Sequence, residues 1–243
     1  MPEPKSLKEI MLLPEAIKKD WLKAVRKEFT FLITNETFEE DAKPLDGDEI
    51  IPAIIVFKAK VTSKGYLDKL KARCCARGDL QVKSHDKDDV WSPCVFARTF
   101  KVFITRAVTK RRAVKQLDFI GAFCQGIMKT RLFVQLPREF GEVFPELKKY
   151  FEKPQLLRKS LYGTDIATKV FNTDLTEWLV NNEYIPFLQS EVDPSLFIHR
   201  KENGEFLFLI VFFAFFGFFD FLVFSRSGGV RRGRGRSLHA RGT

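Results

Sequence analysis

Residues 116–123 read QLDFIGAF, an apolar strand that ends in an aspartate and is followed by small and aromatic residues. Strand ends hold carboxylates rigidly and Mg²⁺ prefers such oxygens, so Asp118 is the sharpest catalytic candidate in the chain. A two-metal nucleotidyl-transfer site also needs a carboxylate from a second strand. Asp220, in FFDFLVF, is the only other acid in a comparable apolar context. Taken alone, a strand-end aspartate is more often a turn former or a helix cap.

Composition limits the classes of protein to consider. The 243 residues are enough for one large domain or two small ones without disulfides. With 45% hydrophobic and 30% charged residues, the chain is neither a disordered polar tail nor wholly membrane-embedded. The four cysteines and three histidines lack metal-ligand spacing, which argues against a zinc site. The N-terminal sequence lacks a secretory pattern, so we expect an intracellular protein, cytoplasmic or nuclear.

The C-terminal part has a composition of its own. Residues 226–243 contain six arginines and no acid, and ten of the 26 phenylalanines lie within residues 206–224. We expect residues 226–243 to form an Arg/Gly-rich disordered tail that binds nucleic acid through its charge. A reading-frame or gene-model accident explains the same residues equally well.

Hydrophobic periodicity predicts both helices and strands. Apolar residues at helical spacing predict amphipathic helices over residues 14–34 and 166–182. Residues 54–61 and 67–78 predict a hairpin rich in lysine and arginine. Residues 95–108 fit either a helix or a strand. The further predicted strands are 132–136, 196–199 and 206–213.

Several short motifs follow one another in a specific order. They are WLKAVRKEFTFLITNETF (21–38), FKAK (57–60), KARCCARGDLQ (71–81), WSPCV (91–95), QLDFIGAF (116–123), VQLPREF (134–140) and KSLYG (159–163). In this order and spacing they resemble the reverse transcriptase domain of copia-type (Ty/copia, pseudovirus) retrotransposon Pol polyproteins. The resemblance runs from about Leu7 to Ser225, nearly all of the chain before the tail.

The resemblance implies an α+β fold of polymerase fingers and palm over residues 1–225, with an antiparallel palm sheet packed on helices and the thumb missing. By this likeness, Asp118 and Asp220 are the catalytic residues that bind a pair of Mg²⁺ ions. The implied activity is that of an RNA-directed DNA polymerase. The implied partners are an RNA or DNA template-primer and deoxynucleotides.

The resemblance also implies nucleotide-binding residues. Lys71 and Arg73 would lie near the triphosphate, where a guanidinium can hold phosphate oxygens in a fork. Phe123 would pack under the incoming sugar and exclude a ribose 2′-hydroxyl. From the residues alone, Lys71 and Arg73 fit a solvated charged hairpin equally well, and Phe123 fits an ordinary core residue better.

Departures from the family pattern predict impaired catalysis. The family's second metal motif is aromatic, apolar, Asp, Asp. Phe218 to Phe221 keeps its first Asp only, whereas Gly217 to Asp220 keeps its second only. We prefer the first register, because Tyr to Phe is a mild change. Three further segments also depart from the family: Thr164 to Thr168 lacks the glutamine of the nucleotide pocket, Gly121 replaces a polar residue, and Cys74-Cys75 replaces an apolar pair.

Two alternatives remain open from the sequence. One is a non-catalytic nucleic-acid-binding protein that uses the basic hairpin and the Arg/Gly tail. The other is a membrane-anchored protein, since residues 206–224 approach the length that spans a bilayer and arginines follow them. An Asp within the span is costly, and the family pattern explains the same residues as two palm strands, so we do not expect a membrane partner.

Overall fold

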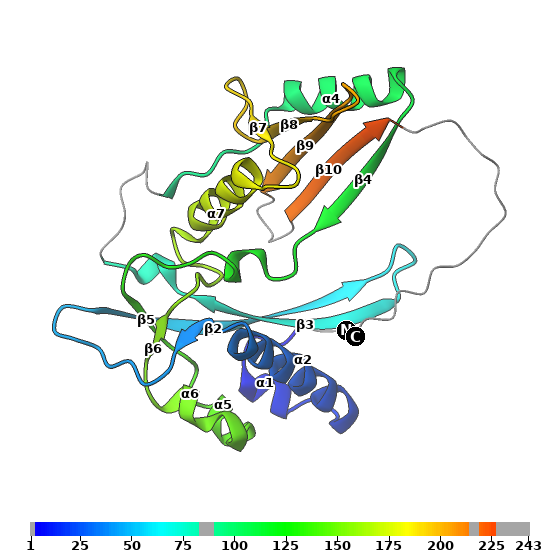
Figure 1. Ribbon diagram of the computed structural model, residues 1–243. Helices are drawn as coiled ribbons and strands as arrows, with labels where there is room; N and C mark the ends of the chain where they lie inside the picture. The colour runs from blue at the N-terminus through cyan, green and yellow to red at the C-terminus, as the bar shows by residue number, and fades with distance from the viewer. Residues whose placement is uncertain (1–2, 83–89, 214–218, 227–243) are drawn as a thin grey trace. The chain divides into compact units, whose positions relative to one another are not determined.

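A computed structural model describes residues 3–82, 90–213 and 219–226, with backbone only for Asp118 and for residues 212–213 and 219–226 (Figure 1). It has mixed α and β structure, as the sequence predicts. The chain forms two compact units, each built from separate segments, and therefore no single linker marks the boundary between them. Unit 1 comprises Met1–Pro93, Phe119–Asn181 and Phe215–Gly217, and unit 2 comprises Cys94–Asp118, Asn182–Ala214 and Phe218–Thr243.

Unit 1 contains a five-stranded sheet in the order β1-β6-β5-β2-β3. The strands are β1 (Phe38–Glu39), β2 (Glu49–Val61), β3 (Leu67–Ala76), β5 (Leu132–Gln135) and β6 (Gln155–Leu157). The long antiparallel pair β2–β3 is the hairpin that the sequence predicts, and β5 runs parallel to β2 on its other side. Strand β3 therefore lies at an edge of the sheet.

Helix α2 (Glu15–Thr34) lies beside strand β3 (Figure 1), and its buried side chains supply much of the core of unit 1. It begins after Pro14, and the four apolar residues that predict it are all buried: Trp21, Val25, Phe29 and Leu32. The Trp21 and Phe57 rings meet edge to face with centroids 5.5 Å apart. Alternate residues of β2, from Ile51 to Phe57, face the same core, so the strand turns its remaining residues outward.

Short helices complete unit 1. These are α1 (Leu7–Met11), α5 (Phe140–Val143), α6 (Lys148–Glu152), α7 (Ala167–Asn181) and the 3-10 turns η1 (Gly78–Leu80), η2 (Ala122–Cys124) and η3 (Pro145–Leu147). The Phe140 and Phe151 rings pack against Phe29 of α2, with centroids 6.0 and 4.8 Å away. The helix predicted over 166–182 is α7.

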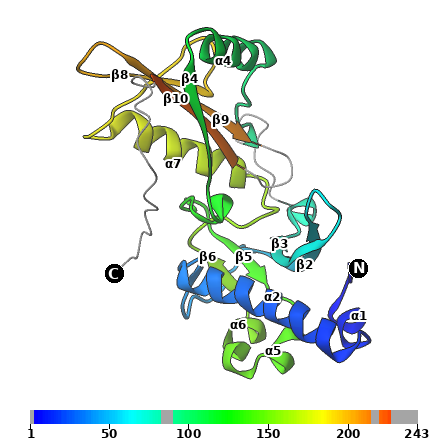
Figure 2. The same cartoon turned by 90° about the vertical axis from the view of Figure 1, so that its right-hand side faces the viewer.

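Unit 2 contains an antiparallel sheet in the order β4-β10-β9-β8-β7 (Figure 1). Figure 2 shows β4, β8, β9 and β10 of this sheet after a turn of 90°. The strands are β4 (Arg112–Asp118), β7 (Leu188–Gln189), β8 (Leu196–Arg200), β9 (Phe206–Phe213) and β10 (Phe219–Arg226). Residues 95–108, open between helix and strand, form most of helix α4 (Ala97–Thr109). Phe103 and Ala107 of α4 pack with Ile210 of β9 in a small core.

The phenylalanine-rich stretch is not helical where the structure describes it. Residues 206–213 and 219–226 are the paired strands β9 and β10, as the family resemblance implies. Among the described residues, no helix has the length and apolar character needed to cross a membrane.

Candidate functional site

Asp118 and Asp220 lie directly opposite each other on neighbouring strands. Asp118 ends β4, Asp220 is the second residue of β10, and the two are partners in the antiparallel register. Asp220 is in turn opposite Phe212 of β9. Opposite residues of an antiparallel pair have Cα atoms roughly 4.5–5.5 Å apart. Asp118, Asp220 and Phe212 thus form one row across three strands, here named the carboxylate row.

Strand alternation limits which residues share this row. The next row along the strands, on the opposite face, is Leu117, Phe221 and Val211. Phe219 and Phe221 are the positions that the two sequence registers offer for the missing aspartate. Each is one residue from Asp220, so neither belongs to the carboxylate row. Phe212 is the third position in that row.

The carboxylate row offers the type of ligand that Mg²⁺ prefers, but only two such ligands. Carboxylate oxygens are the hard donors that Mg²⁺ prefers, and one or two carboxylates with substrate phosphates and water complete its shell. The expected motifs would supply three carboxylates, whereas Asp118 and Asp220 supply two. Among the side chains that the structure describes, no group of three or more His, Cys, Asp or Glu could hold a metal ion.

The outward face of the β2–β3 hairpin in unit 1 is strongly basic. Lys58 is opposite Lys71, Lys60 is opposite Lys69, and Arg73 follows Lys71 on the same face. These five residues are here named the basic hairpin face. Like charges in opposite positions destabilise a strand pair. At Lys58 this repulsion is offset by an ion pair with Glu3, whose Oε1 lies 3.1 Å from Nζ. The predicted triphosphate-binding residues Lys71 and Arg73 both lie on this basic face.

Lys71 is the most perturbed residue of this face. Partial burial lowers its pKa to about 8, and repulsion from Arg73 and Lys60 acts in the same direction, while Glu28 opposes the shift. The charged form of Lys71 still predominates at neutral pH, but by a smaller margin than for an ordinary lysine. A bound phosphate would favour the charged form.

Glu28 of α2 is a residue that the sequence does not single out. Its Oε1 accepts a hydrogen bond from the Cys74 backbone N–H at 3.1 Å, which satisfies a donor on the edge strand β3. Burial raises the pKa of Glu28, and the Cys74 hydrogen bond, Lys71 and Arg73 act against that shift. The available signal was its place in the WLKAVRKEFTF motif, directly before the buried Phe29.

The KSLYG motif contacts the KARCCARGDLQ motif through the backbone. Ala76 donates its N–H to the Tyr162 carbonyl at 2.6 Å, and Gly78 donates to the Gly163 carbonyl at 3.1 Å. Gly163 has φ +85°, and a Cβ on it would lie 2.2 Å from the Ala76 carbonyl oxygen. A Cβ on Gly78 would meet the Gly163 oxygen at 2.1 Å. Glycine is required at both positions for this approach.

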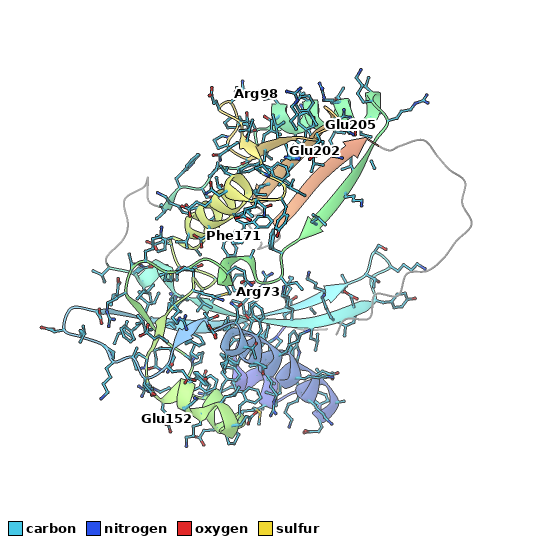
Figure 3. The ribbon with its side chains drawn as sticks, viewed as in Figure 1. Arg73, Arg98, Glu152, Phe171, Glu202 and Glu205 are labelled. Carbon is cyan, nitrogen blue, oxygen red and sulfur yellow. The ribbon has the colours of Figure 1, made fainter. Side chains whose placement is uncertain are left out.

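Tyr162 joins two of the predicted nucleotide-binding residues. Its ring centroid is 5.6 Å from that of Phe123 and 5.0 Å from Cζ of Arg73, which is labelled in Figure 3. The aromatic face restricts the orientation of the Arg73 guanidinium. Lys71, Arg73 and Phe123 all belong to unit 1, and the two aspartates belong to unit 2. Their functional roles remain predictions.

The departures in unit 1 fit their surroundings. Gly121 has φ +63°, and a Cβ there would lie 2.3 Å from the tip of the Phe31 ring, so a larger residue requires that ring to move. Cys74 is fully buried and burial raises its pKa, so it packs as a small apolar residue. The Thr164 hydroxyl donates to the Leu161 carbonyl at 3.0 Å, within the turn before α7.

A family model described as "Reverse transcriptase (RNA-dependent DNA polymerase)" matches residues 35–216. The matched range includes Asp118, Lys71, Arg73 and Phe123 and ends before Asp220. No solved structure matches the chain significantly. This match does not favour the non-catalytic nucleic-acid-binding protein that the sequence left open.

Curated relatives agree with the family model. The chain is 28% identical over 210 residues to the retrovirus-related Pol polyprotein from transposon TNT 1-94 of Nicotiana tabacum, covering 86% of this chain. It is 27% and 28% identical to those from transposons RE2 and RE1 of Arabidopsis thaliana, covering 81% and 77% of this chain. It spans only 12–15% of the length of these relatives. The family match covers more than half of the chain, which therefore belongs to the reverse transcriptase family, as a domain of the copia-type retrotransposon Pol polyproteins.

Proposed function

We propose that this chain is built for RNA-directed DNA synthesis and that its catalysis is impaired. Unit 2, with the antiparallel sheet packed on α4, is assigned to the palm. Unit 1, with the basic hairpin face, is assigned to the fingers. None of the described elements is assigned to a thumb. In this proposal residues 1–225 are the polymerase domain, and residues 226–243, of which all but Arg226 lie outside the described residues, are a separate tail.

The carboxylate row carries the proposal. Asp118 and Asp220 come from separate strands, more than 100 residues apart in the sequence, and occupy opposite positions. The pair would hold Mg²⁺, which makes a primer hydroxyl more acidic and neutralises phosphate charge. With two carboxylates instead of three, we expect the free protein to hold one ion and to hold it weakly.

The basic hairpin face would bind the nucleotide. Lys71 and Arg73 would neutralise the triphosphate, and stacking on Tyr162 would orient the Arg73 guanidinium for a forked contact. Phe123, fixed by its edge contact with Tyr162, would pack under the sugar and exclude a ribose 2′-hydroxyl. These contacts orient the nucleotide without taking part in the chemistry.

A metal titration tests this proposal. We expect calorimetry to detect weak Mn²⁺ binding by the wild type and its loss in Asp118→Asn, because that substitution removes half of the negative charge in the row. Asp68→Asn, at an exposed position of β3, is the matched control and should bind as the wild type does. Equal binding by wild type and Asp118→Asn, or no binding by either, would contradict the site.

A further inference from the structure

A second basic surface lies on unit 2, apart from the residues assigned above. Between residues 94 and 117 the sequence has seven basic side chains and no acid. The chain as a whole has 41 basic and 31 acidic residues, so this segment accounts for much of the net charge of +10. The family resemblance assigns no role to it.

The structure places four of these residues on the exposed part of one helix. Arg98, Lys101, Arg106 and Lys110, at α4 and its C-cap, are all exposed and are here named the cationic helix face. Arg98 is labelled in Figure 3. The opposite side of α4 is anchored by Phe103 and Ala107 against Ile210. Among the described residues, no acid forms an ion pair with these four.

Aromatic rings hold two of these cations. Cζ of Arg106 lies 5.4 Å from the Phe208 ring centroid, and Cζ of Arg98 lies 5.4 Å from that of Phe96. Stacking restricts the guanidinium without occupying its N–H edges, which stay available for an anion. The cationic helix face thus has two arginines whose positions are restricted by stacking. Within the described part of the chain, no acid forms an ion pair with any of its four residues.

The spacing and chemistry of the face fit a phosphate backbone. At 1.5 Å per residue, Arg98 and Lys110 are separated by about 18 Å along the helix, roughly five steps of a nucleic-acid strand at 3.4 Å. The exposed apolar residues between them are Val102 and Val108. Helices that insert into membranes carry Trp, Phe or Leu on such a face, which favours nucleic acid over a lipid surface.

We propose that the cationic helix face binds the phosphate backbone of nucleic acid without sequence preference, as a contact separate from the basic hairpin face. The choice of nucleic acid as the ligand rests on the proposed function. Each phosphate neutralised releases a counterion, so log affinity falls linearly with log salt, with a slope of roughly 0.9 per contact on a duplex.

The test is the salt dependence of binding to a primed RNA template, measured by fluorescence anisotropy without metal or nucleotide. The variant is Arg98→Gln/Lys101→Gln/Arg106→Gln. The matched control neutralises three exposed lysines on α2, Lys19, Lys23 and Lys27. We expect the α4 variant to lower the slope by about 2 to 3 and to weaken binding at least tenfold. The control should keep the wild-type slope.

A charge-conserving variant separates the effect of charge from that of stacking. Arg98→Lys/Arg106→Lys keeps the charge, so it should keep most of the salt-dependence slope. If it lowers the slope as much as the glutamine variant does, the effect comes from stacking and the proposal is overturned. Equal slopes for the α4 variant and the α2 control would also overturn it. The proposal would also be overturned if the α4 variant lost binding to anionic lipid vesicles while its binding to RNA stayed unchanged. Because no metal is present, these outcomes are independent of the Asp118→Asn titration.

Discussion

The two sheets differ in how strongly their contacts depend on particular residues of the family motifs. In unit 1, KARCCARGDLQ and KSLYG touch through backbone atoms, and glycine is required at Gly78 and Gly163. In unit 2, β9 and β10 pair along eight-residue strands that are mostly phenylalanine, leucine and valine. Strand pairing uses the backbone N–H and C=O groups, and among the residue types only proline lacks the N–H. A carboxylate in β9 or β10 can therefore be lost without loss of the strand.

Because of this difference, the residues that the fold needs are not the same as those that the candidate metal site needs. Changes in unit 1 must fit tight contacts, and Gly121 illustrates this because the Phe31 ring fills the space that a side chain would take. A substitution in the carboxylate row would remove charge, whereas the backbone pairing that sets the register would stay the same. Unit 2, which we assign to the palm, could thus keep its strand arrangement after losing a carboxylate.

The largest expected effect is on unit 1. Gly163→Ala should destabilise the protein by several kcal/mol, since an L-residue at φ +85° costs about 1–2 kcal/mol and the new Cβ meets the Ala76 carbonyl. Gly65→Ala, at φ +80° with nothing within 4 Å, is the control and should show the backbone cost alone. Urea denaturation measures both. Equal losses would mean that the contact between the two motifs is not tight.

A gain of metal binding should follow when the row in unit 2 is completed. Phe212→Asp adds a third carboxylate in register with Asp220 and Asp118, so Mn²⁺ should bind at least about tenfold more tightly, or about 1.4 kcal/mol. Phe221→Asp, preferred from the sequence register, places the carboxylate in the next row and should not tighten binding. Calorimetry compares the two. Tighter binding by Phe221→Asp alone would support the register preferred from the sequence.

A smaller effect concerns pH in unit 1. Lys71 is charged below its pKa of about 8, so deoxynucleoside triphosphate binding without metal should weaken several-fold as pH rises from 7 to 9. Arg73, Lys60, Lys69 and Glu28 are the charged groups that act on Lys71. Lys71→Arg should bind equally across this range. A wild-type affinity that does not change with pH would exclude Lys71 from the phosphate site.

The smallest effect is expected for Glu28→Gln, with Glu28→Leu as the comparison. Because its folded-state pKa is raised, the protonated form favours folding at low pH, and this contribution is lost as pH rises through the folded pKa. Glu28→Gln keeps an acceptor for Cys74, so it should gain stability relative to wild type as pH rises from 4 to 7. Glu28→Leu removes the acceptor and should cost about 1–3 kcal/mol. Thermal denaturation across this pH range distinguishes them.

Local patterns in the sequence predicted most of the elements. Trp21, Val25, Phe29 and Leu32 predicted α2, and alternation with a Lys-Gly turn predicted the β2–β3 hairpin. These signals depend on neighbours along the chain. Residues 95–108 stayed ambiguous because an apolar run of this kind fits a helix and a strand alike. In the structure these residues form most of α4, which packs on β9.

The sequence predicted the residue types of the candidate site but not their arrangement. The sequence named Asp118 and Asp220, yet Phe212 belongs to their row only because β9, β10 and β4 pair in one register. Glu28 and Tyr162 were missed for the same reason. Their contacts with Cys74 and Arg73 join segments far apart in the chain, which no local pattern records.

Primer extension on a primed RNA template, with Mg²⁺ and deoxynucleotides, tests the central claim most directly. The purified wild type should extend the primer little or not at all, because the second metal motif keeps only one of its two aspartates. Robust Mg²⁺-dependent extension that Asp118→Asn abolishes would contradict the claim of impairment and would establish the catalytic role of Asp118.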